Sequence, residues 1–204
     1  CSPPPRDKAN QDIIWRGLAN GTFDVFSSDH APYRFDEHGK LAAGPNAPFN
    51  KIANGVPGLE VRLPLLFDGV RRGHFSLQQF VALASTNAAR LYGLYPLKGT
   101  IAVGSDADIA IWDPDKEVTI TYDLIHDDVG YTPYEGVAVK GWPVMVFNRG
   151  RTVIENGALH VERGSGEFLP CEQPDPARPR GHLPPELDPV RNFGASLLNQ
   201  EQST

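Results

Sequence analysis

The sequence predicts an α/β protein whose first half alternates strands with helices and whose second half is rich in short strands. A helical segment lies between two strand-like segments within residues 1–29, and amphipathic segments follow up to residue 92. From residue 97 the helical periodicity gives way to short runs of β-branched residues. A crossover of this length between parallel strands occurs in βα barrels and in doubly wound sheets, and these observations leave both open.

Composition and charge limit the classes of function. The chain has 204 residues, 40% of them hydrophobic, and a net charge of -6. Without a basic stripe it is unsuited to binding nucleic acid, and it has neither a long apolar run nor a signal-like start. Its two cysteines, Cys1 and Cys171, lie at opposite ends and do not suggest a disulfide framework. We expect a cytoplasmic protein with no nucleic-acid or membrane partner.

The first elements are a strand end, a helix and a strand. Residues 1–6 are expected to end a strand, because successive prolines cannot donate to a sheet. Apolar side chains at helical spacing predict a helix over residues 8–20, which Gly21 stops. Residues 24–29 are the second predicted strand, and Pro32 prevents its continuation.

Asp29 and His30 stand where this second strand ends. The C-terminal ends of parallel strands face the active site, so both side chains would project into a pocket. A simpler alternative is that Asp29 caps the next turn, and an isolated Asp-His pair favours that alternative.

A long irregular loop is predicted next, over residues 33–57. Long loops in compact domains are usually functional. The Asn54-Gly55 pair near its end tolerates positive φ and can turn backbone polar groups toward a ligand. An ordinary structural turn is the simpler interpretation of the same pair.

Three helices are predicted after the loop. Apolar residues mark one face over residues 59–70, where Pro64 predicts a kink or a late start. A capping box formed by Ser76 and Gln79 begins the second helix, and the third covers residues 86–92. These helices are expected to pack around the parallel strands and to carry no chemistry.

A β-rich unit is predicted after Pro96. It would contain a turn at Asp113-Pro114 and a hairpin turn at Arg149-Gly150. The predicted strands cover residues 109–112, 118–121, 136–139, 144–147 and 152–154. Asp106 and Asp108 could be metal ligands, but beside a Gly-Ser turn they are better explained as partners of backbone amides.

Beyond Glu162 the strand pattern ends. Seven prolines among residues 170–189 exclude regular structure and predict an extended arm. Its apolar residues favour packing on a neighbouring subunit over free movement. They are Leu183, Leu187, Val190, Phe193, Leu197 and Leu198.

Three motifs in a fixed order carry a family resemblance. They are Ser27-Ser-Asp-His-Ala-Pro-Tyr33, then Asn54-Gly-Val-Pro-Gly-Leu-Glu60 with Arg62-Leu-Pro-Leu-Leu66, and finally Lys98-Gly-Thr-Ile-Ala-Val-Gly-Ser-Asp-Ala-Asp-Ile-Ala-Ile-Trp-Asp113. Together they closely resemble the hydantoinase and dihydropyrimidinase branch of the amidohydrolase superfamily. The resemblance runs from Cys1 to Leu169 or thereabouts.

The resemblance implies the C-terminal part of a (β/α)₈ TIM-like barrel, followed by part of a small β-sandwich domain and an extended C-terminal arm. The implied boundaries are 1–96, 97–161 and 162–204. It implies a homo-oligomer, a tetramer or a dimer, that hydrolyses a cyclic amide bond in a hydantoin or dihydropyrimidine ring to give an N-carbamoyl amino acid. Two divalent metal ions, usually zinc and bridged by a carboxylated lysine, would serve as cofactors.

The resemblance also implies roles for individual residues. Asp29 matches the aspartate at the end of the eighth barrel strand, which binds a metal and shuttles the proton of the attacking hydroxide. A carboxylate suits both tasks. Ser2 and Asn54 match positions that hold the amide and carbonyl edges of the substrate ring. His30 follows the aspartate in the motif and is expected to be a structural partner instead of a metal ligand.

Part of the family pattern is missing from this chain. None of its six histidines shows His-x-His spacing, and the other metal ligands with the bridging lysine would lie upstream of Cys1. One carboxylate cannot hold two metals, and a whole barrel of this type needs roughly 250 residues. Because the chain also begins without a methionine, we expect the C-terminal part of a longer enzyme, inactive by itself.

Two alternatives stay open. The first is a non-catalytic dihydropyrimidinase-like scaffold protein. Asp29 within an intact Ser-Asp-His-Ala-Pro string argues against it, because a scaffold has no need for a carboxylate in a barrel mouth. The second is another cyclic amidohydrolase, such as an allantoinase or a dihydroorotase. The residues around the ring substituent would decide, and the loop that follows Pro32 favours a hydantoinase.

Overall fold

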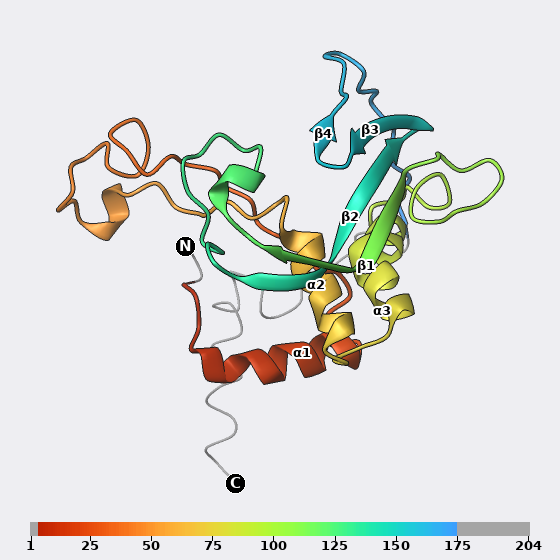
Figure 1. Ribbon diagram of the computed structural model, residues 1–204, viewed down its shortest axis with the longest axis horizontal. Coiled ribbons are helices and arrows are strands. Elements are labelled where there is room, and N and C mark those ends of the chain that lie inside the picture. The colour runs from red at the N-terminus through yellow and green to blue at the C-terminus, as the bar shows by residue number, and fades with distance from the viewer. Residues whose placement is uncertain (1–3, 175–204) are drawn as a thin grey trace, which may run out of the picture.

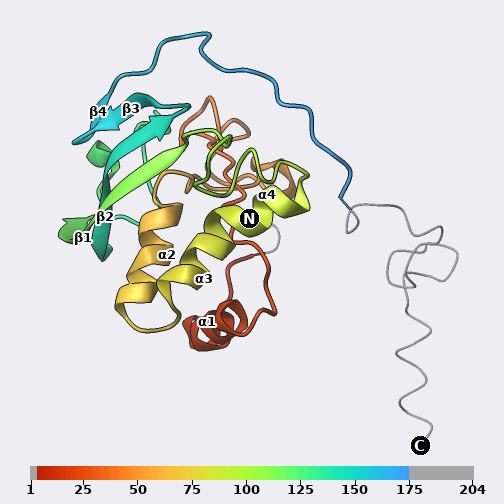
Figure 2. The same ribbon diagram turned by 90° about the vertical axis from the view of Figure 1, so that its right-hand side faces the viewer.

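The computed structural model describes residues 4–174, which form helices packed against a four-stranded antiparallel sheet (Figure 1). The predicted α/β class is confirmed. Figure 2 shows helices α2 and α3 on one side of the sheet, with α1 below them. Ser2 and all but the first part of the predicted arm lie outside the described residues.

The first helical element consists of η1 (Lys8–Asn10) and α1 (Gln11–Ala19). Asp7 begins it, because its carboxylate accepts a hydrogen bond from the Ala9 amide at 2.8 Å. Gly21 follows its end with a φ of 82°. This is the helix predicted from the apolar spacing.

Residues 24–29 do not form the predicted strand. The segment has no regular secondary structure. Phe26 donates its amide hydrogen to the Leu83 carbonyl at 3.0 Å. His30, just beyond, forms an isolated parallel bridge with Val56. A strand requires a neighbouring backbone along its whole length. Within residues 4–174 the segment has no such partner, and the one bridge forms only at the residue that follows it.

Residues 33–57 form the predicted irregular loop, which includes one short turn, η2 (Phe49–Lys51), and projects from one side of the molecule (orange in Figure 1). Helix α2 (Arg62–Arg71) follows. Pro64 lies in its first turn, where a proline costs no hydrogen bond. Pro64 was expected to cause either a kink or a late start of the helix. The structure shows the late start, because α2 begins at Arg62 and not at residue 59.

The next helices run on from one another: α3 (Leu77–Val81), η3 (Ala82–Thr86) and α4 (Asn87–Leu91). The capping box is confirmed, because the Ser76 hydroxyl accepts from the Gln79 amide at 3.2 Å and the Gln79 side chain accepts from the Ser76 amide at 2.8 Å. The segment η3 is a π-helical turn, which no feature of the sequence predicted.

The sheet contains β1 (Ile109–Thr119), β2 (Ala138–Asn148), β3 (Arg151–Glu155) and β4 (Ala158–Leu159) in sequence order, with η4 (Tyr122–Leu124) between β1 and β2. Each of the two long strands joins two predicted short ones. The turn predicted at Asp113-Pro114 is wrong, because β1 absorbs the proline in a register shift between Asp113 and Glu117. The hairpin turn at Arg149-Gly150 is confirmed.

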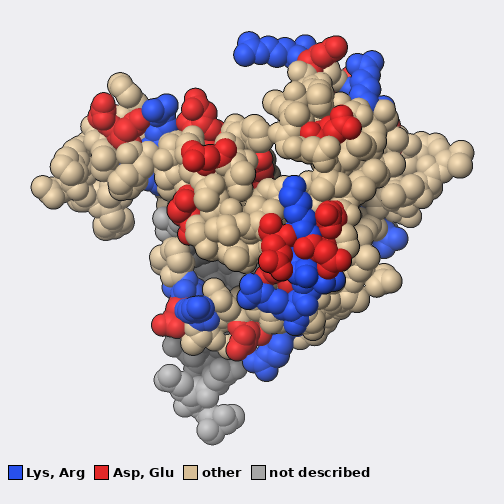
Figure 3. Space-filling view, viewed as in Figure 1, with Lys and Arg blue, Asp and Glu red and all other residues tan. Residues whose placement is uncertain are grey.

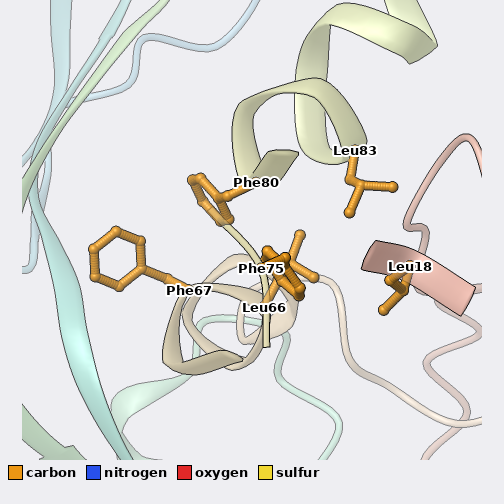
Figure 4. Close-up of a cluster of buried hydrophobic side chains, with 6 residues drawn as sticks. All are labelled: Leu18, Leu66, Phe67, Phe75, Phe80 and Leu83. Carbon is orange, nitrogen blue, oxygen red and sulfur yellow. The ribbon is translucent and has the colours of Figure 1, made fainter. Parts of the chain in front are cut away.

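A cluster of buried side chains joins the helices to the sheet (Figure 4). Phe67 of α2 stacks on Trp112 of β1 with ring centroids 4.7 Å apart. It also meets Phe80 of α3 edge to face at 5.4 Å. The close packing depends on Gly141 of β2, where an added Cβ would lie 2.2 Å from the Phe67 ring. The full cluster is Leu18, Leu66, Phe67, Phe75, Phe80 and Leu83.

Acidic and basic side chains are interspersed on the face shown in Figure 3. Among the ion pairs of the described residues, Asp115 of β1 pairs with Arg71 of α2 at 3.1 Å and with Lys140 of β2 at 3.5 Å. Exposed pairs of this kind contribute little stability. The helices of the described part of the chain are too short or too polar to cross a membrane.

Candidate functional site

The candidate site lies where the segment that contains Asp29 meets the chain around Asn54. The turn predicted at Asn54-Gly55 is wrong, because residues 53–55 form no turn and the turn follows at residues 59–61, directly before α2. We call residues 53–61 together the Asn54 turn. His30 and Val56 form a parallel bridge, and the Ala31 amide donates to the Val56 carbonyl at 3.0 Å. Two segments that are far apart in sequence therefore run side by side. The structure brings together the surroundings of two predicted site residues, Asp29 and Asn54, whereas Ser2 lies outside the described residues.

Asp29 has an unusual backbone conformation and a free side chain. Its φ is 46°, in the left-handed region that few residues other than glycine adopt. Its carboxylate is exposed and makes no hydrogen bond or ion pair within residues 4–174. The alternative in which Asp29 caps the next turn is therefore wrong. Positive φ at such a residue is a reason to suspect a functional position.

His30 fixes this segment to the turn. Its Nδ1 accepts hydrogen bonds from the amides of Gly58 at 3.1 Å and Leu59 at 3.2 Å. An acceptor at Nδ1 must be unprotonated, so the neutral ring carries its hydrogen on Nε2. His30 therefore has a structural role that holds the neighbouring Asp29 in place.

The polar groups of Asn54 are free. Asn54 is exposed, and neither its backbone nor its side chain makes a hydrogen bond to the described residues. Gly55 has a φ of 118°, and an added Cβ would lie 2.2 Å from the Ala31 side chain. Only glycine lets the turn approach the Asp29 segment this closely.

Two further residues support the site and were not predicted from the sequence. Arg62, at the start of α2, donates through Nη1 to the Phe26 carbonyl, and burial lowers the pKa of its guanidinium. Tyr134 lies against the turn, where its ring would be 3.4 Å from a Cβ at Gly58, and burial raises the pKa of its hydroxyl. Arg62 belongs to the second family motif, but nothing in the spacing of either residue indicates these contacts.

Glu60 ties the same turn to the segment between β1 and β2. Its carboxylate accepts from the His126 amide at 2.8 Å and lies 2.8 Å from His126 Nδ1. The turn that follows Asn54 is therefore hydrogen-bonded to two other segments. His30 connects it to the segment that contains Asp29, and Glu60 connects it to the β-rich unit.

The described residues do not by themselves fit a metal centre. Within residues 4–174 there is no group of three or more His, Cys, Asp or Glu side chains that could hold an ion. Asp29 offers a single carboxylate. Asp106 and Asp108 both pair with Lys98, the former at 2.8 Å, and Asp108 accepts the Arg149 amide at 2.8 Å. Asp108 therefore binds a backbone amide as predicted, although that amide belongs to Arg149 and not to the Gly-Ser turn. Asp106 pairs with a lysine side chain instead of the expected amide.

A cavity lies elsewhere, between α2 and the sheet. Its volume is about 510 Å³, and neither Asp29 nor Asn54 lines it. Trp112, Trp142 and Leu63 form part of its apolar wall, and Glu60 and His126 lie at its edge. The candidate site is therefore separate from this cavity.

Comparison with known proteins defines the class. The amidohydrolase family model matches residues 6–153, and the chain belongs to this family. It is 44% identical over 168 residues to the D-hydantoinase of Ralstonia pickettii, a match that covers 82% of this chain and 36% of that protein. The chain therefore spans little more than a third of the length of this relative.

Solved structures agree with this assignment. The D-hydantoinase from Bacillus sp. AR9 superposes with a TM-score of 0.78 at 45% identity, over 82% of this chain and 36% of that chain. The dihydropyrimidinase from Brevibacillus agri NCHU1002 superposes with a TM-score of 0.73 at 46% identity, over 78% and 34% of the respective chains. The resemblance that the sequence motifs carry is confirmed.

Proposed function

We propose that this chain contributes one wall of the active site of a cyclic amidohydrolase that opens a hydantoin or dihydropyrimidine ring to an N-carbamoyl amino acid. The observation that carries the proposal is the free carboxylate of Asp29, held at positive φ beside the unpaired polar groups of Asn54. The similarity to D-hydantoinases and to a dihydropyrimidinase supports the substrate class.

Asp29 is the proposed acid and base of the reaction. Its carboxylate accepts a proton from the attacking water as the oxygen adds to the ring carbonyl carbon. It then returns that proton to the ring nitrogen as the C–N bond breaks, which gives one molecule with a carbamoyl group and a carboxyl group. The carboxyl group releases the second proton of the water to solvent and becomes a carboxylate. Asn54 and Ser2 are proposed to orient the ring through its amide and carbonyl edges, which fixes the carbonyl carbon in front of the water.

Two divalent metal ions are proposed to complete the site, and zinc is the proposed metal. Such ions lower the pKa of bound water and so supply the nucleophile at neutral pH. This chain would contribute Asp29 as one oxygen ligand. The remaining ligands and the bridging carboxylated lysine would lie in a part of the enzyme that the described residues do not include.

The same proposal assigns residues 1–96 to the last part of a (β/α)₈ barrel, 97–161 to a β-sandwich and 162–204 to an arm on a neighbouring subunit. The enzyme would be a cytoplasmic homo-oligomer, a dimer or a tetramer. Light scattering of a full-length enzyme with and without residues 162–204 tests the role of the arm, which is wrong if the molar mass does not fall.

A chimeric enzyme tests the function. In it, this chain replaces the aligned 168 residues of the Ralstonia pickettii D-hydantoinase. The chimera should hydrolyse hydantoin, whereas the 204-residue chain alone should not. Asp29→Asn should lower kcat at least about 100-fold, because the proton carrier is lost. Asp24→Asn is the matched control, since Asp24 is also exposed and its side chain is free.

The choice of substrate separates the alternatives. Hydantoin and dihydrouracil should be opened by the chimera, and allantoin and dihydroorotate should not. Preference for either of the last two would replace the proposed substrate class. Full activity of the Asp29→Asn chimera would remove Asp29 from the mechanism.

A further inference from the structure

Lys40 reaches from the long loop to the turn that contains Asn54. Its Nζ donates hydrogen bonds to the Ala53 carbonyl at 2.8 Å and to the Gly55 carbonyl at 2.5 Å. These two carbonyls belong to the residues on either side of Asn54. One ammonium group therefore holds the turn from both sides without occupying any polar group of Asn54 itself.

The ammonium group of Lys40 has no acidic partner. Within residues 4–174 no carboxylate pairs with it, and the side chain is half-buried. A partly buried charge is costly unless it is well solvated by polar groups, and hydrogen bonds from a charged donor are stronger than those between neutral groups. The two carbonyls, with the Tyr33 ring centroid 5.9 Å away, provide that environment.

The loop that delivers Lys40 is itself well ordered by local contacts. The Lys40 amide donates to the Arg34 carbonyl at 2.8 Å, and Arg34 forms an ion pair with Asp36 at 2.7 Å. Gly39 is packed so closely that an added Cβ would lie 2.1 Å from the Arg34 carbonyl oxygen. Because Arg34 follows the Asp29 motif by only a few residues, Lys40 links the carboxylate segment to the Asn54 turn.

We propose that Lys40 is a positioning residue for substrate binding at Asn54. It fixes the flanking carbonyls so that the amide, carbonyl and side chain of Asn54 stay directed to the substrate ring. This inference rests on the proposed function, since it requires Asn54 to hold the ring. Lys40 itself touches neither the substrate nor the reacting atoms.

The test compares Lys40→Met with Lys51→Met in the chimera described above. Methionine keeps the length of the apolar stem and removes the donors. Lys51 lies in the same loop, is exposed and has a free side chain. Lys40→Met should raise KM for hydantoin about 10-fold and change kcat less than about threefold, because ring orientation in the bound state is weakened. Lys40→Arg, which keeps the charge and donors, should recover part of the loss.

A second measurement needs no catalysis. In the 204-residue chain, the ¹³C chemical shifts of the Ala53 and Gly55 carbonyls should change in Lys40→Met and stay constant in Lys51→Met. Constant shifts in Lys40→Met would show that the contacts are absent and would overturn the inference. Changed shifts with an unaltered KM would overturn the positioning role alone. An inactive unmodified chimera would overturn the proposed function and this role with it.

Discussion

Gly55 occupies a position that the site geometry reserves for glycine. Its φ is 118°, and a Cβ would lie 2.2 Å from the Ala31 side chain, a distance at which atoms must move. Gly44, in the same loop, also has a positive φ, of 90°, but open space surrounds it. Comparing the two glycines therefore distinguishes two contributions to the free energy of unfolding. One comes from the left-handed backbone conformation and the other from the close approach of Ala31.

Substituting each of these glycines by alanine measures that difference. Gly55→Ala should lower the free energy of unfolding by about 2–4 kcal/mol, because strain and overpacking add. Gly44→Ala should cost about 1 kcal/mol, from the left-handed backbone alone. Urea unfolding of the 204-residue chain gives both values. Equal losses would mean that the contact between Gly55 and Ala31 is not formed.

At the scale of residues, the sequence singled out Asp29 and Asn54, whose side chains make no hydrogen bond within residues 4–174, and missed the residues that hold their segments in place. Asp29 and Asn54-Gly55 can be recognised in the sequence as candidate site residues from their residue types and from the glycines and prolines around them. Lys40 and Arg62 act on carbonyls 13 to 36 positions away, and such contacts leave no periodic pattern in the sequence. Only the folded backbone reveals them.

At the scale of elements, prediction succeeded where an element is stabilised locally. Helices α1 and α3 have caps or stops within a few residues, and both were predicted. The strand predicted over residues 24–29 failed because pairing partners, which a strand needs, are not determined by its own residues. Strand β1 was divided wrongly at Pro114 because a bulge can hold a proline that a regular ladder cannot.

The segment before β1 offers a test of pH dependence. Lys98 pairs with Asp108, which also accepts the Arg149 amide in the β2–β3 turn at 2.8 Å. Burial raises the pKa of Asp108, but the bonds from Lys98 and Arg149 outweigh it, so that this pKa lies below its usual value. Burial likewise lowers the pKa of Lys98, while its two aspartates outweigh it and place that pKa above the usual value.

The signs of these shifts define the pH window. A lowered carboxyl pKa stabilises the fold above the unfolded value, about pH 3.9, and this contribution is lost as pH falls through the folded pKa. A raised lysine pKa stabilises it below about pH 10.4 and is lost as pH rises. Lys98→Met should therefore cost about 1 kcal/mol between these limits, and less outside them. Urea unfolding at pH 3, 7 and 11 checks this, and a loss that does not vary with pH would contradict it.

At the scale of the whole molecule, Phe67 joins the helical layer to the sheet. Its ring stacks on Trp112 at 4.7 Å and fills the space left by Gly141. Phe67→Ala should lower the free energy of unfolding by about 3–5 kcal/mol through the cavity that it leaves. Phe49, which is 90% exposed, provides the control, and Phe49→Ala should change stability by less than about 0.5 kcal/mol. Comparable effects of the two substitutions would contradict this packing.

Helix α2 contacts both the segment that leads to Asp29 and the sheet. At its N-terminal end Arg62 bonds the Phe26 carbonyl just before the Asp29 motif, and farther along Asp68 accepts the Lys140 amide of β2 at 3.1 Å. A helix transmits displacement along its axis because its backbone hydrogen bonds resist stretching. A random mutational screen for lost turnover should therefore return substitutions at Gly141 and Trp112. Under the proposed function, such a screen would map lost activity to a sheet that contains neither Asp29 nor Asn54.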